Sequence, residues 1–458
     1  MIPTFQVSGN LEEISQVEKV LVEAGLSPAA AKGKSQLFVE SRKAIPLDGP
    51  AVGFYVPGRV EVLGKHTDYA GGESLVAPIE RGFCLVSVAR EDHRVILTRV
   101  ETGETIGFEI SADLQPVRGH WANYPMTVIR RVARNFAREL QGVDIAFGSD
   151  LPPAAGMSSS SAFLVAIFLA LATRNQLDTT RQWQNDIHSL EDLASYLATV
   201  ENGQSFKNLT GDRGVGTLGG SEDHIAILLG RPRHLIRYLY IPVQFIEAIP
   251  LPPGYVFAIG ASGVVAEKTG AALEKYNAAS NLARQLVSLW QQVTGRDEPT
   301  VGAIVRLGPQ AVETLRKAIR EQVADSEEQN QLRNRLEHFL LENEEVLPQA
   351  AEALRTGDLQ RFGQLVDRSQ WGAEHLLGNQ VPETIFLARS ARELGAVAAS
   401  AFGAGFGGAV WALVEAEKAE RFLEQWRQAY LSAFPEHDSA AEFLLSGAGP
   451  AAFALVPS

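Results

Sequence analysis

The chain has 458 residues, of which 45% are hydrophobic and 21% are charged, so it is long enough for two or three domains that each bury a core. This ordinary composition excludes a disordered chain, a collagen and a low-complexity fibre. The net charge of −13 argues against nucleic acid or an anionic membrane surface as the main partner.

The chain is expected to be a cytoplasmic, multi-domain enzyme with no membrane partner. Its single cysteine, Cys84, cannot form an internal disulfide and fits a reducing compartment. The first six residues, MIPTFQ, contain neither a basic nor an apolar region typical of a signal peptide. The longest apolar run, residues 162–172, is shorter than the ~20 residues that a membrane helix needs.

An antiparallel, meander-like sheet is predicted between Gly53 and Ile110. Runs of β-forming residues alternate there with proline and glycine turns. The predicted strands cover residues 54–56, 60–63, 75–78, 83–88, 95–97 and 106–110.

Helices and strands are mixed in the rest of the chain. Apolar residues recur at helical spacing from Trp121 to Phe136, and a strand at 143–147 precedes a loop and the apolar helix 162–172. Strands are predicted at 255–259 and 410–414, and long amphipathic helices lie between them. The fold class is therefore α+β, with mixed or antiparallel sheets and two lobes joined near residues 230–250.

Residues 151–161 read LPPAAGMSSSS and link a predicted strand to a strongly apolar helix. The first amides of a helix have no partner within it, and the helix dipole is positive there, so an anion is stabilised. Gly156 lets the backbone approach a phosphate, and serine hydroxyls can add hydrogen bonds or bind Mg²⁺. A serine-rich cap on a core helix is the alternative interpretation.

Several separate motifs resemble those of the GHMP kinase superfamily, and of galactokinases in particular. The segment 57–72, PGRVEVLGKHTDYAGG, is similar to the galactokinase signature, and 401–408, AFGAGFGG, is similar to the glycine-rich third motif. Further likeness lies in WANY at 121–124, in the serine loop, in GSEDH at 220–224 and in the pair Tyr276-Asn277. The resemblance implies a two-lobed GHMP kinase-like fold with the active site between lobes 1–240 and 241–458.

The activity that this resemblance implies is direct transfer of the γ-phosphoryl group of ATP to the anomeric hydroxyl of galactose or a similar sugar. Asp223 would be the catalytic aspartate, and Arg59 would lie beside it. Positioning and charge neutralisation are what phosphoryl transfer needs most. Whether Asp223 removes the proton or only aligns the hydroxyl stays open. The residues that would bind the sugar are Lys65, His66, Asp68, Gly220 and Tyr276.

The resemblance also implies the residues on the ATP side. The ATP- and phosphate-binding residues would be Gly156, Ser158, Ser159, Ser160 and Trp121. Mg²⁺ would be bound by Ser160, with Ser159 as the neighbouring possibility, and by Glu201. The expected partners are a small sugar and ATP, with no nucleic acid, and a monomer is favoured.

Two positions in the signature depart from the galactokinase pattern. Galactokinases usually have Asn where this chain has Glu61, and Glu where it has Lys65. A lysine would reverse the charge near carbon 6 of the sugar and favour an altered group, as in galacturonate. Alternatively, Glu61 and Lys65 pair with each other and leave the site little changed. The stretch 207–216 is longer than in galactokinases and is expected to form a surface loop.

These departures leave other functions open. The first is a kinase for a carbon-6-altered sugar or a pentose such as arabinose. The second is an inactive sensor that binds sugar and ATP, although a sensor need not keep both Arg59 and Asp223. The third is a kinase of the same superfamily that acts on a phosphorylated intermediate or a non-sugar alcohol.

Overall fold

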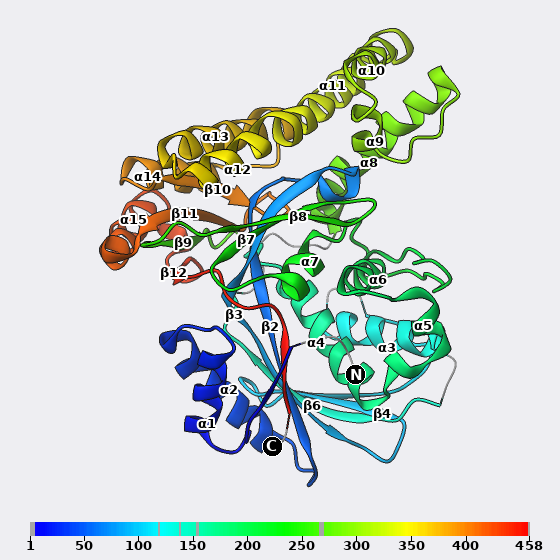
Figure 1. The fold of residues 1–458 in the computed structure, drawn as a ribbon, viewed down its shortest axis with the longest axis vertical. Helices are drawn as coiled ribbons and strands as arrows, with labels where there is room; N and C mark the ends of the chain where they lie inside the picture. The colour runs from blue at the N-terminus through cyan, green and yellow to red at the C-terminus, as the bar shows by residue number, and fades with distance from the viewer. Residues whose placement is uncertain (1–4, 118–119, 137–138, 153–154, 265–269, 457–458) are drawn as a thin grey trace.

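The computed structural model describes residues 5–117, 120–136, 139–152, 155–264 and 270–456, without the side chains of residues 5 and 270–276. The strands in these ranges form two sheets (Figure 1). The larger sheet contains β1 (Phe5–Ser8), β2 (Ala51–Leu63), β3 (Glu73–Ala89), β4 (Arg94–Arg99), β5 (Thr105–Glu109), β6 (Val143–Ser149), β7 (His234–Leu239), β8 (Gln244–Pro250) and β13 (Phe453–Val456). The smaller sheet contains β9 (Tyr255–Ala261), β10 (Ala398–Phe402), β11 (Ala409–Glu415) and β12 (Glu442–Ser446).

The larger sheet has the order β1-β13-β2-β3-β6-β4-β5, and β7 pairs with both β3 and β8. The strands predicted between Gly53 and Ile110 all overlap observed strands, but 54–56 and 60–63 are joined in β2, across a register shift after Pro57, and 75–78 and 83–88 are joined in β3. The predicted meander is wrong between β3 and β4. The strand β6 lies between them, antiparallel to β3 and parallel to β4. The reason is burial: β6 is buried over nearly its whole length and needs neighbours on both sides, whereas β5 alternates half-buried and exposed residues and suits the edge.

Helices cover both faces of the larger sheet (Figure 1). One face carries α1 (Ile14–Glu23) and α2 (Pro28–Ala44), and the other carries α3 (Asn123–Asn135), α4 (Ser159–Arg174), α5 (Arg181–Asp186), α6 (Leu190–Asn202) and α7 (Glu222–Leu229). The apolar helix predicted at 162–172 is confirmed as the interior of α4. Residues 161–172 of α4 are all buried, so its N-terminus is held on a rigid base.

The second half of the chain adds a helical assembly to the smaller sheet, whose order is β10-β11-β9-β12. Its helices are α8 (Gly270–Thr294), α9 (Val301–Val305), α10 (Pro309–Gln322), α11 (Ser326–Leu340), α12 (Leu347–Thr356), α13 (Leu359–Gly372), α14 (Pro382–Glu393) and α15 (Ala419–Ala433). Figure 1 shows α9 to α11 extending away from both sheets. Among the described residues, no helix combines the length and the apolar character needed to cross a membrane.

Strands from both sides of the predicted boundary at residue 240 belong to the larger sheet. Both β8 and β13 follow that residue, and both belong to the larger sheet. The last strand, β13, pairs with β2 on one side and β1 on the other. The division into 1–240 and 241–458 stays a prediction.

The stretch 207–216, expected at the surface, is held to the helices beneath it. The side chain of Asp212 is 2% exposed, and it accepts a hydrogen bond from Arg130 Nε of α3 at 2.8 Å. Leu209 is also buried. The stretch is therefore anchored at its centre, while its lysine and asparagine at 207–208 are exposed.

Candidate active site

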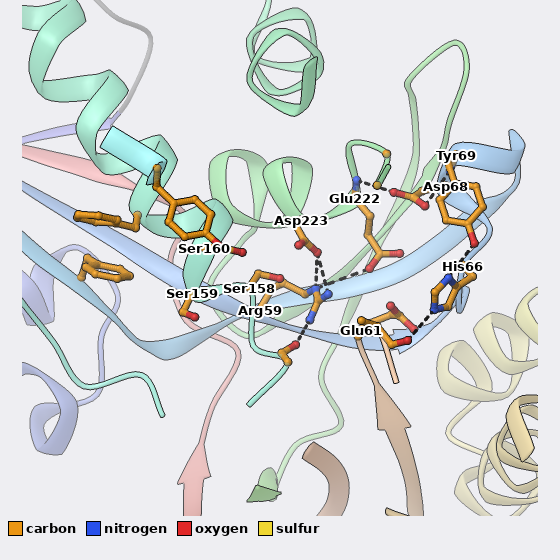
Figure 2. Close-up of a pocket in the computed structure, with 18 of the residues that line it drawn as sticks. Arg59, Glu61, His66, Asp68, Tyr69, Ser158, Ser159, Ser160, Glu222 and Asp223 are labelled. Atoms are coloured by element: carbon orange, nitrogen blue, oxygen red, sulfur yellow. Dashed lines mark hydrogen bonds and ion pairs between the residues drawn. The ribbon is translucent and has the colours of Figure 1, made fainter. Parts of the chain in front are cut away.

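A cavity of about 320 Å³ lies between β2, the loop before α4, the start of α7 and the loop after β10 (Figure 2). Segments associated with both sheets therefore form its wall. The lining includes the ionisable side chains Arg59, Glu61, His66, Asp68, Glu222 and Asp223, the serines 158–160, and the aromatic side chains Tyr69, Phe83, Trp121, Tyr124 and Phe163.

Arg59 is the central cation of this cavity. Its side chain is buried; Nε donates to Asp223 Oδ1 at 2.8 Å, and Nη1 donates to the carbonyl oxygen of Gly156 at 2.6 Å. Glu222 Oε1 lies 3.7 Å from Arg59 Nε. Burial by itself would lower the pKa of Arg59, but the carboxylates of Asp223, Glu222 and Glu61 raise it overall. The guanidinium therefore stays charged and fixes Asp223 beside the serine loop.

The serine loop turns into α4 at Ser158, whose φ of 58° is left-handed. The Oγ atom of Ser158 is buried and has no hydrogen-bond partner among the described residues. The first backbone amides of α4 also lack partners within the helix, and the dipole makes this end positive. An unpartnered hydroxyl beside the amides of a helix N-terminus suits an anion with several oxygens, such as a phosphate.

Two glycine loops meet at the cavity. Gly156 has a φ of 75° and Gly403 a φ of 78°, values that favour glycine. A side-chain carbon on Gly403 would lie only 2.8 Å from the carbonyl oxygen of Gly156. The glycine-rich segment 401–408 therefore supports the serine loop by close backbone contact.

Behind Asp223, the hydroxyl of Ser161 joins two carboxylates. Its Oγ atom lies 2.7 Å from Glu201 Oε2 and 3.2 Å from Asp223 Oδ2. Ser161 is 1% exposed and Glu201 is 6% exposed, so both atoms are held in a solvent-poor environment. His224 Nε2 lies 3.4 Å from Glu201 Oε2 on the far side.

Ser160 and Glu201 supply oxygen donors suited to a divalent cation. Ser160 Oγ lies 3.5 Å from Glu201 Oε1. Mg²⁺ in phosphoryl-transfer sites is usually held by one or two protein oxygens together with substrate phosphates and waters. No cluster of three or more His, Cys, Asp or Glu side chains suited to a metal occurs in the described part of the chain. The pair fits a cation that the nucleotide helps to bind.

The ring of His66 is fixed by hydrogen bonds at both nitrogens. Nε2 lies 3.2 Å from the carbonyl oxygen of Ala404, and Nδ1 lies 2.7 Å from Tyr69 Oη. Because a carbonyl only accepts, we assign the proton to Nε2, and the Tyr69 hydroxyl donates to Nδ1. Burial and the charge of Arg335 lower the pKa of His66 to about 4. The ring is therefore uncharged at neutral pH.

Asp68 and Gly220 are in close contact across the cavity wall. Asp68 accepts hydrogen bonds from the backbone amides of Tyr69 at 2.8 Å and Glu222 at 3.3 Å. A side-chain carbon on Gly220 would clash with Asp68 Oδ2. Burial raises the pKa of Asp68 to about 6. The signature segment and the start of α7 are thereby held together.

Trp121 lies within a group of aromatic side chains. Its ring centre is 5.8 Å from that of Phe147 and 6.2 Å from that of Phe163, and Nε1 donates to Glu104 Oε1 at 3.1 Å. Phe163 also stacks on Phe83, with 5.1 Å between ring centres. These rings give the cavity an apolar wall on which a flat ligand can stack.

Lys65 does not line the cavity. Its amine is buried and donates to Ser369 Oγ of α13 at 2.6 Å. The Ser369 hydroxyl in turn donates to Glu342 Oε1 at 3.0 Å, and Glu342 lies in the π-helix Leu341–Val346. Glu342 Oε1 also accepts from the backbone amide of Gly64 at 2.8 Å. Lys65 thus connects the signature segment to the C-terminal helices.

Most of the predicted site residues come together in the cavity wall. Glu201 lies behind the wall, where it contacts Ser160 and Ser161. Lys65 lies outside the cavity and contacts Ser369. Tyr276 belongs to α8, but its side chain lies outside the described residues. The predicted residues that line the cavity are Arg59, His66, Asp68, Trp121, Gly156, Ser158, Ser159, Ser160, Gly220 and Asp223.

Sequence reasoning missed the roles of Ser161 and Glu222. The sequence signal for Ser161 is its place as the last of four serines, directly before the apolar run 162–172. A serine at the edge of a buried helix is itself buried, and Ser161 is 1% exposed. Glu222 was interpreted only as part of the motif that carries Asp223. Two adjacent acids at the start of α7 were a signal that one of them would be buried.

We expect Lys65→Glu to destabilise the fold. The new carboxylate would be buried near Glu342 in place of the amine that donates to Ser369 Oγ. A buried charge left without a compensating cation costs about 3–5 kcal/mol, which urea unfolding followed by circular dichroism would detect. Lys19→Glu, on the exposed surface of α1, is the control. Unchanged unfolding of the Lys65 variant would contradict the buried contact.

Three segments of the chain match known families. Residues 47–88 match the galactokinase galactose-binding signature, 123–211 match the GHMP kinases N terminal domain, and 350–433 match the GHMP kinases C terminal region. The first segment contains Arg59, the second contains the serine loop, and the third contains Gly403. The three matched segments therefore meet at the cavity.

Similar proteins agree with these matches. A galactokinase of Roseiflexus sp. (strain RS-1) is 28% identical over 385 residues, which cover 83% of this chain and 88% of the relative. A galactokinase of Glaesserella parasuis serovar 5 (strain SH0165) is 28% identical over 373 residues, covering 80% and 86%.

Solved structures share the fold. The Lactococcus lactis galactokinase complexed with galactose aligns with a TM-score of 0.72 at 23% identity, covering 90% of this chain and 96% of that one. The Methanococcus jannaschii mevalonate kinase aligns with a TM-score of 0.52 at 13% identity, covering 88% and 99%. The chain thus carries, in order, the galactokinase galactose-binding signature and the N terminal and C terminal segments of GHMP kinases, and it is similar to galactokinases over 80–83% of its length.

Proposed function

We propose that the protein is an ATP-dependent galactokinase, which transfers the γ-phosphoryl group of ATP to the anomeric hydroxyl of galactose. The observation that carries this proposal is the contact of Arg59 with both Asp223 and the carbonyl oxygen of Gly156. This contact joins an acidic group suited to a sugar hydroxyl and a loop suited to phosphates within one cavity.

Asp223 accepts the hydrogen bond of the anomeric hydroxyl and aims its oxygen at the γ-phosphorus. The new bond joins that oxygen to phosphorus, the bond to the β–γ bridging oxygen breaks, ADP leaves, and the hydroxyl proton passes to Asp223. Arg59 favours the ionised form of Asp223 and offsets charge on the phosphoryl group. The reaction is held in place by positioning rather than by a covalent intermediate.

The phosphates are bound at the N-terminus of α4, where the backbone amides and the hydroxyls of Ser158 and Ser159 face the cavity. Ser160 and Glu201 would hold Mg²⁺ together with the nucleotide. Bound there, Mg²⁺ supplies neutralisation of phosphate charge. Ser161 orients Glu201 and Asp223 relative to each other.

A neutral hexose is the preferred sugar. The alternative with a carbon-6 carboxylate depended on Lys65 as a cation facing the sugar, and the amine of Lys65 is instead bound to Ser369. The polar lining contains one cationic side chain, Arg59, in the described part of the chain, against four acidic ones. The inactive sensor is also disfavoured, because the Arg59–Asp223 contact has full hydrogen-bond geometry. A reducing cytoplasm suits the buried thiol of Cys84.

The function is tested by measuring ATP consumption with Mg²⁺ across galactose, galacturonate, arabinose, glucose and N-acetylgalactosamine. We expect galactose to be the best substrate and phosphorus NMR to identify an anomeric phosphate as the product. Preference for another sugar would replace galactose in the proposal. Absence of turnover on every sugar, with ATP still bound, would favour the sensor.

We expect Asp223→Asn to lower kcat by about 10²–10⁴-fold, the range for loss of a positioned acid or base. The amide keeps the size of the side chain, so ATP binding measured by calorimetry should change little. Asp438→Asn, in an exposed turn after α15, is the control. A kcat within tenfold of the unmodified enzyme would remove Asp223 from the mechanism.

We expect Ser161→Ala to lower kcat by about 5- to 100-fold, since the loss of a buried hydrogen bond costs about 1–3 kcal/mol. The Mg²⁺ concentration for half-maximal activity should rise in the same variant, because Glu201 loses the donor that orients it. Ser432→Ala removes a helix serine hydroxyl at an exposed position and is the matched control. An unchanged Mg²⁺ response would show that Ser161 has no influence on Glu201.

A further inference from the structure

Glu61 of β2 and Glu222 of α7 form a buried pair of acids in the cavity wall. Each residue is 4% exposed, and the two carboxyl groups lie within hydrogen-bonding reach of each other. Figure 2 shows both side chains beside Arg59. One atom of the pair, Glu61 Oε1, is buried and has no hydrogen-bond partner among the described residues.

Two carboxyl groups this close favour a shared proton over two negative charges. Burial raises the pKa of Glu61 to about 7, partly offset by Arg59 and Lys65. Burial and the proximity of Glu61 raise the pKa of Glu222 well above its usual range. The pair therefore holds at least one proton at neutral pH.

Charged and titratable groups of several described segments face the pair. Arg59 on β2 faces both acids, and Lys65 acts on Glu61 from beyond Gly64. From the other described segments, the groups that face the pair are Asp68, Tyr69, Asp223, Tyr240 and Glu342. Among these groups Asp68, with a pKa of about 6, titrates nearest to Glu61, so any test must separate the two.

The protonation of Glu61 decides what it can recognise. A protonated carboxyl has one donor and one acceptor, as an amide has, whereas a carboxylate only accepts. Galactokinases usually have Asn at this position, so the protonated acid offers the same hydrogen-bonding pattern. A sugar that displaces water from the cavity penalises the ionised form, because a buried charge loses its hydration.

We propose that Glu61 and Glu222 act as one proton-sharing carboxyl pair that binds a hydroxyl of the sugar through the carboxyl group of Glu61 and selects neutral sugars over sugar acids. This inference rests on the proposed function and deepens it, since it assigns a specificity-determining pair to the same cavity. Sugar binding then takes up a proton near neutral pH, and wherever Glu61 is ionised the pair repels a carboxylate on the sugar.

Proton uptake tests the pair without requiring turnover. Galactose binding is measured by calorimetry at pH 7 in buffers that differ in ionisation enthalpy. We expect uptake of about half a proton by the unmodified protein, because Glu61 titrates near this pH, and none by Glu61→Gln. Glu424→Gln, exposed on α15, is the matched control and should retain the uptake. Uptake that persists in Glu61→Gln would assign the proton to Asp68 and overturn the proposal.

Kinetics provide the second test. We expect the KM for galactose to rise as the pH is raised from 6 to 8. The total rise should be about tenfold for each pH unit by which galactose binding raises the pKa of the pair. The kcat and the KM for ATP should change little. Glu61→Gln should show a flat KM close to the low-pH value. Glu61→Leu, which cannot hydrogen-bond, should raise KM about tenfold at every pH. Equal KM values for the Leu variant and the unmodified enzyme would refute the contact.

Substrate analogues identify the hydroxyl and test selectivity. A deoxygalactose that lacks the recognised hydroxyl should bind the unmodified enzyme about tenfold more weakly and the Glu61→Leu variant no more weakly than galactose. At pH 8, where Glu61 is ionised, the ratio of kcat/KM for galacturonate over galactose should rise about tenfold in Glu61→Gln. An unchanged ratio would contradict the selection against sugar acids. Thermal melting of each variant confirms folding, and lack of turnover by the unmodified enzyme would count against the proposed function alone.

Discussion

The buried guanidinium of Arg59 is the interaction on which the geometry of the cavity depends. A cation removed from water is tolerated only when carboxylates and carbonyl oxygens surround it. Arg59 finds them on α7, at Asp223 and Glu222, and on the serine loop, at Gly156. Because these segments lie about 100 and 160 positions away in the chain, the same contact fixes both the fold at this point and the relation between acid and phosphate loop.

The second constraint is steric, and it places the C-terminal half of the chain against the same loop. The backbone at Gly403 approaches Gly156 so closely that a side chain at Gly403 would clash, and its positive φ favours glycine. On the other side of the loop, Ser160 and Ser161 bind the two oxygens of Glu201. The serine loop is thus held by the hydrogen bond from Arg59, by the contact with Gly403 and by the buried carboxylate of Glu201. A loop held in this way needs little rearrangement to bind an anion.

The sequence predicted what is local and missed what depends on distant partners. The apolar run of α4 and the serines before it determine a buried helix with an anion-binding end, whatever surrounds them. Arg59 and Glu61 are two positions apart on β2 and share a face, and Lys65 would share it too if the strand continued. Gly64, with a φ of 100°, turns the chain instead and directs Lys65 to Ser369. The backbone amide of Lys65 donates to Glu342, which lies 277 positions further along the chain. No pattern in the signature segment indicates this contact. The insertion of β6 between β3 and β4 was hidden for the same reason.

The two departures within the signature therefore have separate compensations. The positive charge of Lys65 is balanced among the C-terminal helices and does not line the cavity, whereas the acid at Glu61 does line it and is balanced by Arg59 and by a shared proton. Comparing residue types alone suggests that the cavity has lost an acid and gained a base, and so has become more positive. The structure indicates that it has become more negative, because Glu61 lines the cavity and Lys65 does not. The charge that a ligand meets is set by side-chain direction, so a neutral sugar remains the better occupant although the signature contains a lysine.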